Sequence, residues 1–277
     1  MTQTTIPQPT VSQLDKSGSR PTVLVFAGLD PTGGAGIQAD IETLASLKVH
    51  ALPIVTCLTV QNSENVKQVQ NVDVQLLQQQ VDVLVKDIAV HAIKVGLLFN
   101  SENINLVSNT LKALSSIPVI FDPILKAGGG ANLTDDSTDI DNIIKQMREQ
   151  IIPYTTIITP NSSEARLLTG EQDLDDCAKA LITLGCENVL ITGEHEKDPD
   201  KIKNVLYTNQ NSLCFDWPRL PHQYHGSGCT LASAISAYLV NGESVTNAVQ
   251  QAQSFTNSAL QNAVKLGQHQ YHPNRFK

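Results

Sequence analysis

A glycine-rich segment near the start of the chain could hold a small anionic ligand. Gly28, Gly33, Gly34 and Gly36 lie between an apolar run and a segment with helical spacing. Glycines in such a turn let the backbone approach a ligand closely, although a turn that only shapes the junction is the alternative. The segment is not a Walker A loop, because Gly34 rather than lysine follows Gly33. It fits the loose dinucleotide pattern GxGxxG/A, but the acid expected about 20 residues later is missing, so an oxidoreductase hypothesis rests on this segment alone.

A second loop, Tyr224–Thr230, reads YHGSGCT and precedes a helix of small and apolar residues. Gly226, Ser227 and Gly228 would offer consecutive backbone N–H groups at the helix start, where the dipole favours an anion. Such a site suits the charge on a transferring phosphoryl group. Cys229 would lie in the first helical turn, where a thiolate is favoured, so it could act as a base or a nucleophile. The alternative is a tightly packed helix start with Cys229 as filler.

A third loop follows the apolar run Val119–Phe121 and reads DPILKAGGGA. Its acid, Asp122, would lie at the carboxyl end of a strand, where α/β sheets bind ligands. The three glycines at 128–130 suit a mobile flap, although an ordinary surface loop has the same composition.

Apolar β-rich runs alternate with segments of helical periodicity along almost the whole chain. The strand candidates are 21–27, 52–60, 92–96, 119–121, 156–158 and 188–191, with a hairpin at 205–207 and 213–217. The helix candidates are 37–47, 74–87, 103–114, 137–150, 174–184, 228–240 and 245–264. Continuous apolar strands separated by helices predict a mostly parallel sheet covered on both faces.

Composition predicts one folded domain. The chain has 277 residues, of which 41% are hydrophobic and 17% charged. We expect a flexible N-terminal tail at 1–20, a single domain at 21–265 and a polar C-terminal tail at 266–277. The net charge of −8 argues against non-specific binding to nucleic acid or to an anionic membrane. No apolar run approaches the roughly 20 residues of a membrane helix.

The cysteines and histidines predict neither disulfides nor a transition-metal site. The five cysteines are odd in number and contain no CxxC, so a cytoplasmic location is expected. His195, His269 and His272 lack the spacing of metal ligands. His225 is expected to order its loop rather than to do chemistry.

Seven motifs occur in one order: AGLDPTGGAGIQAD, CLTVQN, IKVG, FDPILKAGGG, ITPNSSEA, LITGEH and HGSGCTLASA. Together they resemble the hydroxymethylpyrimidine/phosphomethylpyrimidine kinases of thiamine biosynthesis, in the ribokinase-like superfamily, from about Val23 to Val264. The resemblance implies a three-layer αβα sandwich with a central, mostly parallel sheet. It also implies two successive phosphorylations with ATP and Mg²⁺, first of the hydroxymethyl oxygen and then of the monophosphate. Relatives are often homodimers, so a homodimer is expected.

The resemblance also assigns site residues. It implies a pyrimidine pocket formed by Gly28, Asp40, Gln61, Leu97 and Ile124. Gln61 would hydrogen-bond the aminopyrimidine, since a carboxamide offers a donor and an acceptor side by side. Gly226, Ser227 and Gly228 would form the anion hole. Cys229 stands where sugar kinases of the superfamily have an aspartate base, so it is the expected base for the first transfer.

For the cofactor, the resemblance implies that Asn161 and Glu164 organise magnesium and its waters, with help from Asp122. Magnesium prefers oxygen ligands and keeps several waters, so these carboxylates would act through water. Thr192 and Gly193 would approach the nucleotide.

This chain departs from many relatives, which have lysine at the position of Thr192, methionine at that of Leu97 and a flap lysine at that of Gly128, two residues after Lys126. These departures affect how the negative charge of the phosphates is neutralised. They bear on the second phosphorylation more than on the first. A pyridoxal or related vitamin kinase on the same fold is the nearest alternative. A pyrimidine-binding sensor without catalysis is another.

Overall fold

A nine-stranded sheet forms the centre of the molecule. The computed structural model describes residues 20–125, 140–196 and 198–276. The strands lie in the order β3-β2-β1-β4-β5-β6-β7-β8-β9. The six central strands from β2 to β7 are parallel. At the edges β3 runs antiparallel to β2, β8 runs antiparallel to β7, and β9 pairs antiparallel with β8. Their bounds are β1 Thr22–Leu29, β2 His50–Gln61, β3 Val66–Asn71, β4 Ala92–Val95, β5 Val119–Phe121, β6 Ile157–Ile158, β7 Asn188–Ile191, β8 Lys201–Thr208 and β9 Ser212–Pro218.

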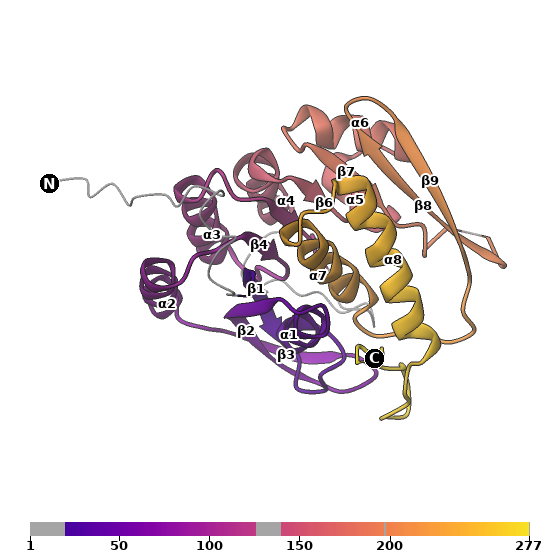
Figure 1. Ribbon diagram of the computed structural model, residues 1–277, viewed down its shortest axis with the longest axis horizontal. Coiled ribbons are helices and arrows are strands. Elements are labelled where there is room, and N and C mark those ends of the chain that lie inside the picture. Colours follow the sequence, from indigo (N-terminus) through magenta and orange to yellow (C-terminus); the bar gives the residue numbers. More distant parts are fainter. Residues whose placement is uncertain (1–19, 126–139, 197, 277) are drawn as a thin grey trace, which may run out of the picture.

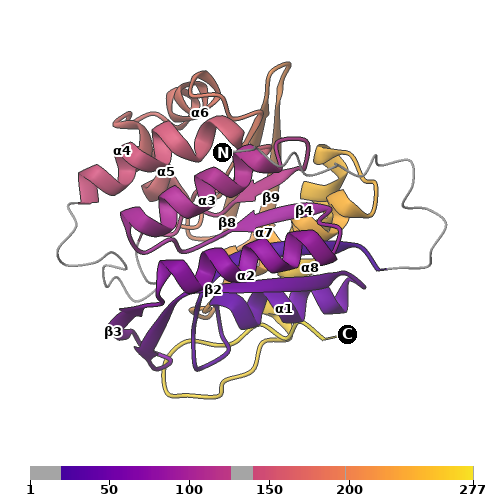
Figure 2. The same ribbon diagram turned by 90° about the vertical axis from the view of Figure 1, so that its left-hand side faces the viewer.

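Helices cover both faces of this sheet (Figures 1 and 2). One face packs against α1, α7 and α8, and the other against α2 to α6. The helices are α1 Gly36–Ser46, α2 Val74–Asp87, α3 Ser101–Ala113, α4 Ile140–Gln150, α5 Ser162–Thr169, α6 Leu174–Thr183, α7 Ser227–Val240 and α8 Val245–Gln261. The expected three-layer αβα sandwich is therefore confirmed.

Strand β1 shows why the sequence folds in this way. Its side chains alternate between the two faces, as the period of two requires. Leu24 and Phe26 enter the core under α2 to α6, and Val23 and Val25 enter the core under α1, α7 and α8. Because both faces are covered, the strand is apolar throughout.

Two elements were absent from the sequence expectations. Strand β3 reads VKQVQN and pairs only with β2 at the sheet edge. Because an edge strand is partly exposed, its sequence lacks the apolar run that marks a buried strand. Helix α5 has eight residues and begins with a capping box at Asn161, within a segment read as a motif rather than as a helix. The expected hairpin at the other edge is confirmed as β8 and β9, with longer strands.

The C-terminal segment is part of the folded domain, which corrects the expectation of a polar tail from residue 266. Backbone bonds join Tyr271 to Gln223 and His225. Arg275 is only 2% exposed, and its guanidinium donates to the carbonyls of Gly33 and Gly34 and to the Thr230 hydroxyl. A buried guanidinium needs such partners, and they lie far away in sequence. The expected N-terminal tail, except Arg20, lies outside the described residues. None of the helices in the described ranges is both long and apolar enough to cross a membrane.

Candidate active site

A cavity of about 620 Å³ opens at the carboxyl ends of the parallel strands. The first glycine loop, the residues after β5 and the start of α7 all contribute to its wall. Of the site residues expected from the sequence, these line it: Gly28, Gln61, Leu97, Asp122, Ile124, Asn161, Glu164, Thr192, Gly226, Ser227, Gly228 and Cys229. Asp40 and Gly193 do not. The expected flap, Lys126 and Gly128 included, lies outside the described residues.

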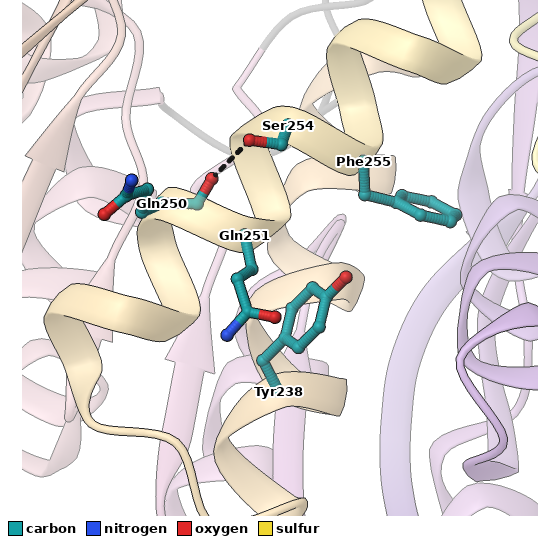
Figure 3. A pocket seen from close by; sticks show the side chains of 5 residues that line it. All are labelled: Tyr238, Gln250, Gln251, Ser254 and Phe255. Carbon is teal, nitrogen blue, oxygen red and sulfur yellow. Dashed lines mark hydrogen bonds between the residues drawn. The ribbon is translucent and has the colours of Figure 1, made fainter.

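A smaller hollow of about 270 Å³ lies between α7 and α8 (Figure 3). Tyr238 comes from α7, and Gln250, Gln251, Ser254 and Phe255 come from α8. Amides, a hydroxyl and two aromatic rings line it, without a charged side chain. The larger cavity, with its carboxylates and loop amides, is therefore the candidate for chemistry.

The two glycine loops touch each other at the rim of the cavity. Gly226 has a φ of +72°, and a Cβ there would overlap the carbonyl oxygen of Gly34. Only glycine therefore allows this contact. Helix α7 begins at the next residue, Ser227, so the first N–H groups of this helix have no carbonyl partner within it. Together with the helix dipole, these groups form a cradle suited to a phosphate.

Asp30 organises the first glycine loop. One carboxylate oxygen accepts the backbone N–H of Thr32 at 2.8 Å. The other accepts the Thr32 hydroxyl and the backbone N–H of Ala35, each at 2.9 Å. Burial alone would raise the pKa of Asp30, but His225 and these N–H groups outweigh it and hold the pKa below its usual value. Asp30 is therefore an ionised anchor of the loop.

Cys229 lines the cavity but is only 5% exposed. Burial raises the pKa of its thiol to about 12, against the opposing positive charge of Lys94. The negative charges of Asp122 and Asp40 act in the same direction as burial. The expectation that the first helical turn favours a thiolate is therefore contradicted, because desolvation and the two carboxylates outweigh the charge of Lys94.

Asp40 lies beneath the cavity rather than on its wall. Its carboxylate is fully buried, 3.0 Å from the ammonium nitrogen of Lys94, and accepts the Ser233 hydroxyl at 2.6 Å. The inner face of α1 points this carboxylate at Lys94 on β4 rather than into the cavity, so its expected role in a pyrimidine pocket stays a prediction. Lys94 was missed from the sequence as a site residue. A lysine within the buried strand AIKV was the available signal, because such a charge must be paired.

Asp122 and Glu164 form a different pair of carboxyl groups at the cavity. Asp122 is 4% exposed, and its Oδ2 has no hydrogen-bond partner. Burial raises the pKa of Asp122 to about 6, although Lys94 opposes this. Burial and the charge of Asp122 raise the pKa of Glu164 to about 8. Glu164 also closes the capping box of α5, accepting the backbone N–H of Asn161 at 2.9 Å.

These two carboxyl groups fit a magnesium ion. They repel each other, and one buried oxygen is unsatisfied, so a cation between or near them would relieve both costs. Their oxygen chemistry is what Mg²⁺ prefers. The described residues contain no cluster of three or more histidine, cysteine and acidic side chains for a metal held by protein alone. A largely hydrated ion is therefore the kind that this site suits.

An apolar wall adjoins Gln61 and Gly28. Leu97 packs with Cys57, and Ile124 packs against this small cluster. A Cβ at Gly28 would lie 2.8 Å from the Cys57 sulfur and 3.1 Å from a Leu97 methyl. The wall would suit one face of a flat ring, and Gln61 offers polar atoms at its edge.

The part of the cavity beside β7 and β8 contains Thr192 but not Gly193. The N–H of Gly193 donates to the side chain of Asn204 at 3.0 Å, and its Cα packs against the backbone of Lys203. Gly193 therefore allows close contact with β8, and its expected approach to a nucleotide stays a prediction. Trp217 and Arg219, which were missed from the sequence, also line this side.

Comparison with known proteins agrees with this geometry. The family model described as phosphomethylpyrimidine kinase matches residues 30–274. The chain belongs to the phosphomethylpyrimidine kinase family. A hydroxymethylpyrimidine/phosphomethylpyrimidine kinase of Bacillus subtilis (strain 168) is 35% identical over 250 residues, which cover 88% of this chain and 90% of that protein.

Solved structures support the same fold. The ADP complex of Bacillus subtilis pyridoxal kinase has a TM-score of 0.82 at 29% identity, covering 93% of this chain and 98% of that one. The phosphomethylpyrimidine kinase from Clostridium difficile 630 has a TM-score of 0.74 at 28% identity, covering 87% of this chain and 100% of that one. Membership in the phosphomethylpyrimidine kinase family identifies the protein as an ATP-dependent kinase.

Proposed function

We propose that this kinase phosphorylates 4-amino-5-hydroxymethyl-2-methylpyrimidine with ATP and then phosphorylates the resulting monophosphate. The product is the pyrimidine diphosphate used in thiamine biosynthesis. One observation supports this most strongly: the N–H groups that begin α7 share a cavity with the Gln61 amide and an apolar wall. An anion cradle beside a flat, amide-edged pocket suits an aromatic alcohol that receives a phosphoryl group.

The acceptor would bind with its ring against Leu97 and Ile124 and its polar edge at Gln61. The carboxamide of Gln61 can pair with a ring nitrogen and an exocyclic amine at the same time. Gly28 leaves room for the ring, because a side chain there would crowd Cys57 and Leu97. Asp40 would act on the site only indirectly, by holding Lys94 beneath the cavity.

Transfer of the phosphoryl group would depend mainly on positioning and electrostatics. The backbone N–H groups of Ser227, Gly228 and Cys229 would stabilise the charge that develops on the transferring group. Asn161, Glu164 and Asp122 would hold magnesium, in part through water. When bound, magnesium would supply charge neutralisation to the ATP phosphates. Thr192 would face the nucleotide.

Cys229 would take the proton of the substrate hydroxyl in the first step. Because the thiol is protonated at neutral pH, this step should depend on the small thiolate fraction, which rises tenfold for each pH unit. The second step uses a phosphate oxygen that is already ionised and needs no base. The two half-reactions should therefore differ in their dependence on Cys229.

The test measures ADP release with magnesium on three acceptors: hydroxymethylpyrimidine, its monophosphate and pyridoxal. We expect turnover of both pyrimidines. Turnover of pyridoxal alone would overturn the proposal in favour of a pyridoxal kinase, the candidate that the Bacillus subtilis pyridoxal kinase structure favours. Binding of the pyrimidine without ADP release would favour a sensor.

We also propose a homodimer in the cytoplasm. Leu58 and Val60 on β2, the strand beside the edge strand β3, are 44% and 56% exposed, so this part of the sheet offers an apolar surface. The five cysteines are free, as suits a reducing compartment. Light scattering of the purified protein, and cell fractionation, would test these two points.

A further inference from the structure

His225 lies between two side chains with different tasks, and the mechanism above does not use it. Its Nε2 atom is 2.8 Å from Oδ2 of Asp30, the anchor of the first glycine loop. The same Nε2 atom is 3.0 Å from the side-chain nitrogen of Gln61, which under the proposed function recognises the pyrimidine. One ring atom therefore connects the loop to the recognition residue.

The carboxylate decides where the proton of His225 lies. Asp30 is ionised, because His225 and the loop N–H groups outweigh the effect of burial on its pKa. An ionised carboxylate only accepts hydrogen bonds. A bare Nε2 would direct its lone pair at that negative charge, so Nε2 carries the hydrogen in both the neutral and the charged imidazole. Nε2 is thus a donor.

This donor conflicts with Gln61 if the side-chain amide nitrogen faces His225, because two N–H groups cannot bond each other. The contact of the Gln61 amide oxygen with Thr59 raises a second conflict. The Thr59 hydroxyl lies 2.9 Å from the carbonyl oxygen of Leu29 and 2.8 Å from Oε1 of Gln61. A hydroxyl has one hydrogen and accepts through its lone pairs, so beside Leu29 a donor is a better second partner for Thr59 than another acceptor. A half turn of the Gln61 amide, whose oxygen and nitrogen are nearly the same size, lets the Thr59 hydroxyl donate to Leu29 and accept from the amide. It also replaces the contact between two donors by a carbonyl oxygen that shares the Nε2 hydrogen with Asp30 in a three-centre bond.

We propose that His225 is a positioning residue that sets acceptor specificity by fixing the direction of the Gln61 amide. In this arrangement the Gln61 carbonyl oxygen shares the Nε2 hydrogen of His225 with Asp30, and the Gln61 amino group donates to Thr59. The edge that faces the cavity then offers an acceptor on the His225 side and a donor on the Thr59 side. An aminopyrimidine matches it when its exocyclic amine lies toward His225 and its ring nitrogen toward Thr59.

The orientation has a consequence for substrate choice. A ring with two acceptors at this edge would face the Gln61 oxygen with one of them and leave it unpaired. An unsatisfied polar pair inside a site lowers affinity by about 10- to 100-fold. The specificity would thus depend on His225, although His225 itself need not touch the substrate.

The first test is spectroscopic and does not depend on activity. Histidine labelled with ¹⁵N in the full chain, assigned with His225→Gln, reports which ring nitrogen carries hydrogen. We expect the Nε2–H form, and a nuclear Overhauser effect between the Gln61 amino protons and Thr59. A bare Nε2 in the neutral ring would overturn the proposal, because Gln61 would then point its amino group at His225. This outcome is separate from failure of the proposed function, which would appear as absence of pyrimidine turnover.

The second test uses kinetics with matched variants. His225→Leu removes the donor and should raise KM for hydroxymethylpyrimidine by about 10- to 100-fold, with KM for ATP within about twofold. His225→Gln keeps an N–H donor and should restore most of the affinity. His269→Leu, at a histidine whose side chain is 45% exposed, is the control and should change neither constant.

A substrate analogue completes the test. His225→Leu should also lose most of the discrimination against the analogue in which an oxo group replaces the exocyclic amine. Equal changes in KM for ATP and pyrimidine, or unchanged discrimination, would overturn the proposal. Should His225→Leu fail to fold, the tautomer measured in the unaltered protein still decides the question.

Discussion

Two pairs of buried charged groups lie at the same site and behave in opposite ways. Asp40 and Lys94 neutralise each other at 3.0 Å, and both are fully buried. Burial alone would lower the pKa of Lys94. The charge of Asp40 outweighs this effect, so the pKa of Lys94 is raised. Asp122 and Glu164 have like charges, and Asp122 keeps an oxygen without a partner. Their pKa values rise to about 6 and about 8.

The difference separates a structural role from a ligand-binding one. The Asp40–Lys94 pair is complete within the protein, so nothing in the cavity needs to contact it. The Asp122–Glu164 pair is incomplete, so it favours a cation from outside. Asp40, Asp122 and Glu164 look alike in sequence, as acids within motifs of the family. Four experiments can break or sharpen this comparison.

The largest expected effect is on stability. Lys94→Met should lower the free energy of unfolding by about 3–5 kcal/mol, because it leaves the Asp40 carboxylate buried without its partner. Denaturant unfolding followed by circular dichroism measures this. The double variant Asp40→Leu with Lys94→Met should recover most of the loss. A single-variant loss below about 1 kcal/mol would mean that this pair is not a complete structural unit.

Asp122→Asn should affect turnover rather than stability. Turnover should fall by about 100-fold, because the carboxylate proposed to face magnesium is removed. Stability should stay the same or rise, since ionised Asp122 is unfavourable in the folded protein. Steady-state ADP release and thermal unfolding on one preparation give both values. A strong loss of stability with little loss of turnover would place Asp122 in the structural class with Asp40.

The pH dependence of stability should expose the incomplete pair. The pKa values of Asp122 and Glu164 are higher in the folded chain than their ordinary values of 3.8 and 4.5. The folded state therefore binds more protons between about pH 4 and 8, from about 4 to 6 through Asp122 and from about 4.5 to 8 through Glu164. Stability falls as pH rises through these ranges, by at most about 1.4 kcal/mol per pH unit for each group.

Thermal unfolding at several pH values measures this slope. Glu164→Gln should flatten the upper part of the range, and magnesium with ATP should flatten it further. A stability that rises from pH 5 to 8 and is unaffected by Glu164→Gln would contradict the raised pKa values.

The smallest expected effect concerns Cys229, whose pKa is raised by burial and by the charges of Asp122 and Asp40, against the charge of Lys94. Cys229→Ala should slow the first half-reaction by about tenfold, less than a base of well-matched pKa contributes, because little thiolate is present at neutral pH. The second half-reaction should change little. Separate assays on the alcohol and on the monophosphate, from pH 6.5 to 9, measure the ratio. Equal losses in both assays would remove Cys229 from the proton transfer.

Much of the architecture could be predicted from the sequence, because it depends on local patterns. The alternation of apolar strands and amphipathic helices predicted the layered parallel sheet. The spacing of Gly226, Ser227 and Gly228 before a helix predicted an anion cradle. Strand β3 and helix α5 escaped notice because one is polar at an edge and the other is short.

What only the tertiary structure decided is which side chains meet. Asp40 lies 54 residues from Lys94, and His225 lies 195 residues from Asp30. Arg275 reaches Gly33 across 242 residues, so the C-terminal segment holds the first glycine loop. The protonation of Cys229 depends on burial and on charges brought together from separate strands. Sequence alone determined which chemical groups were available at each loop. Folding determined their solvation and their partners, and these set whether a charge is structural or free to act.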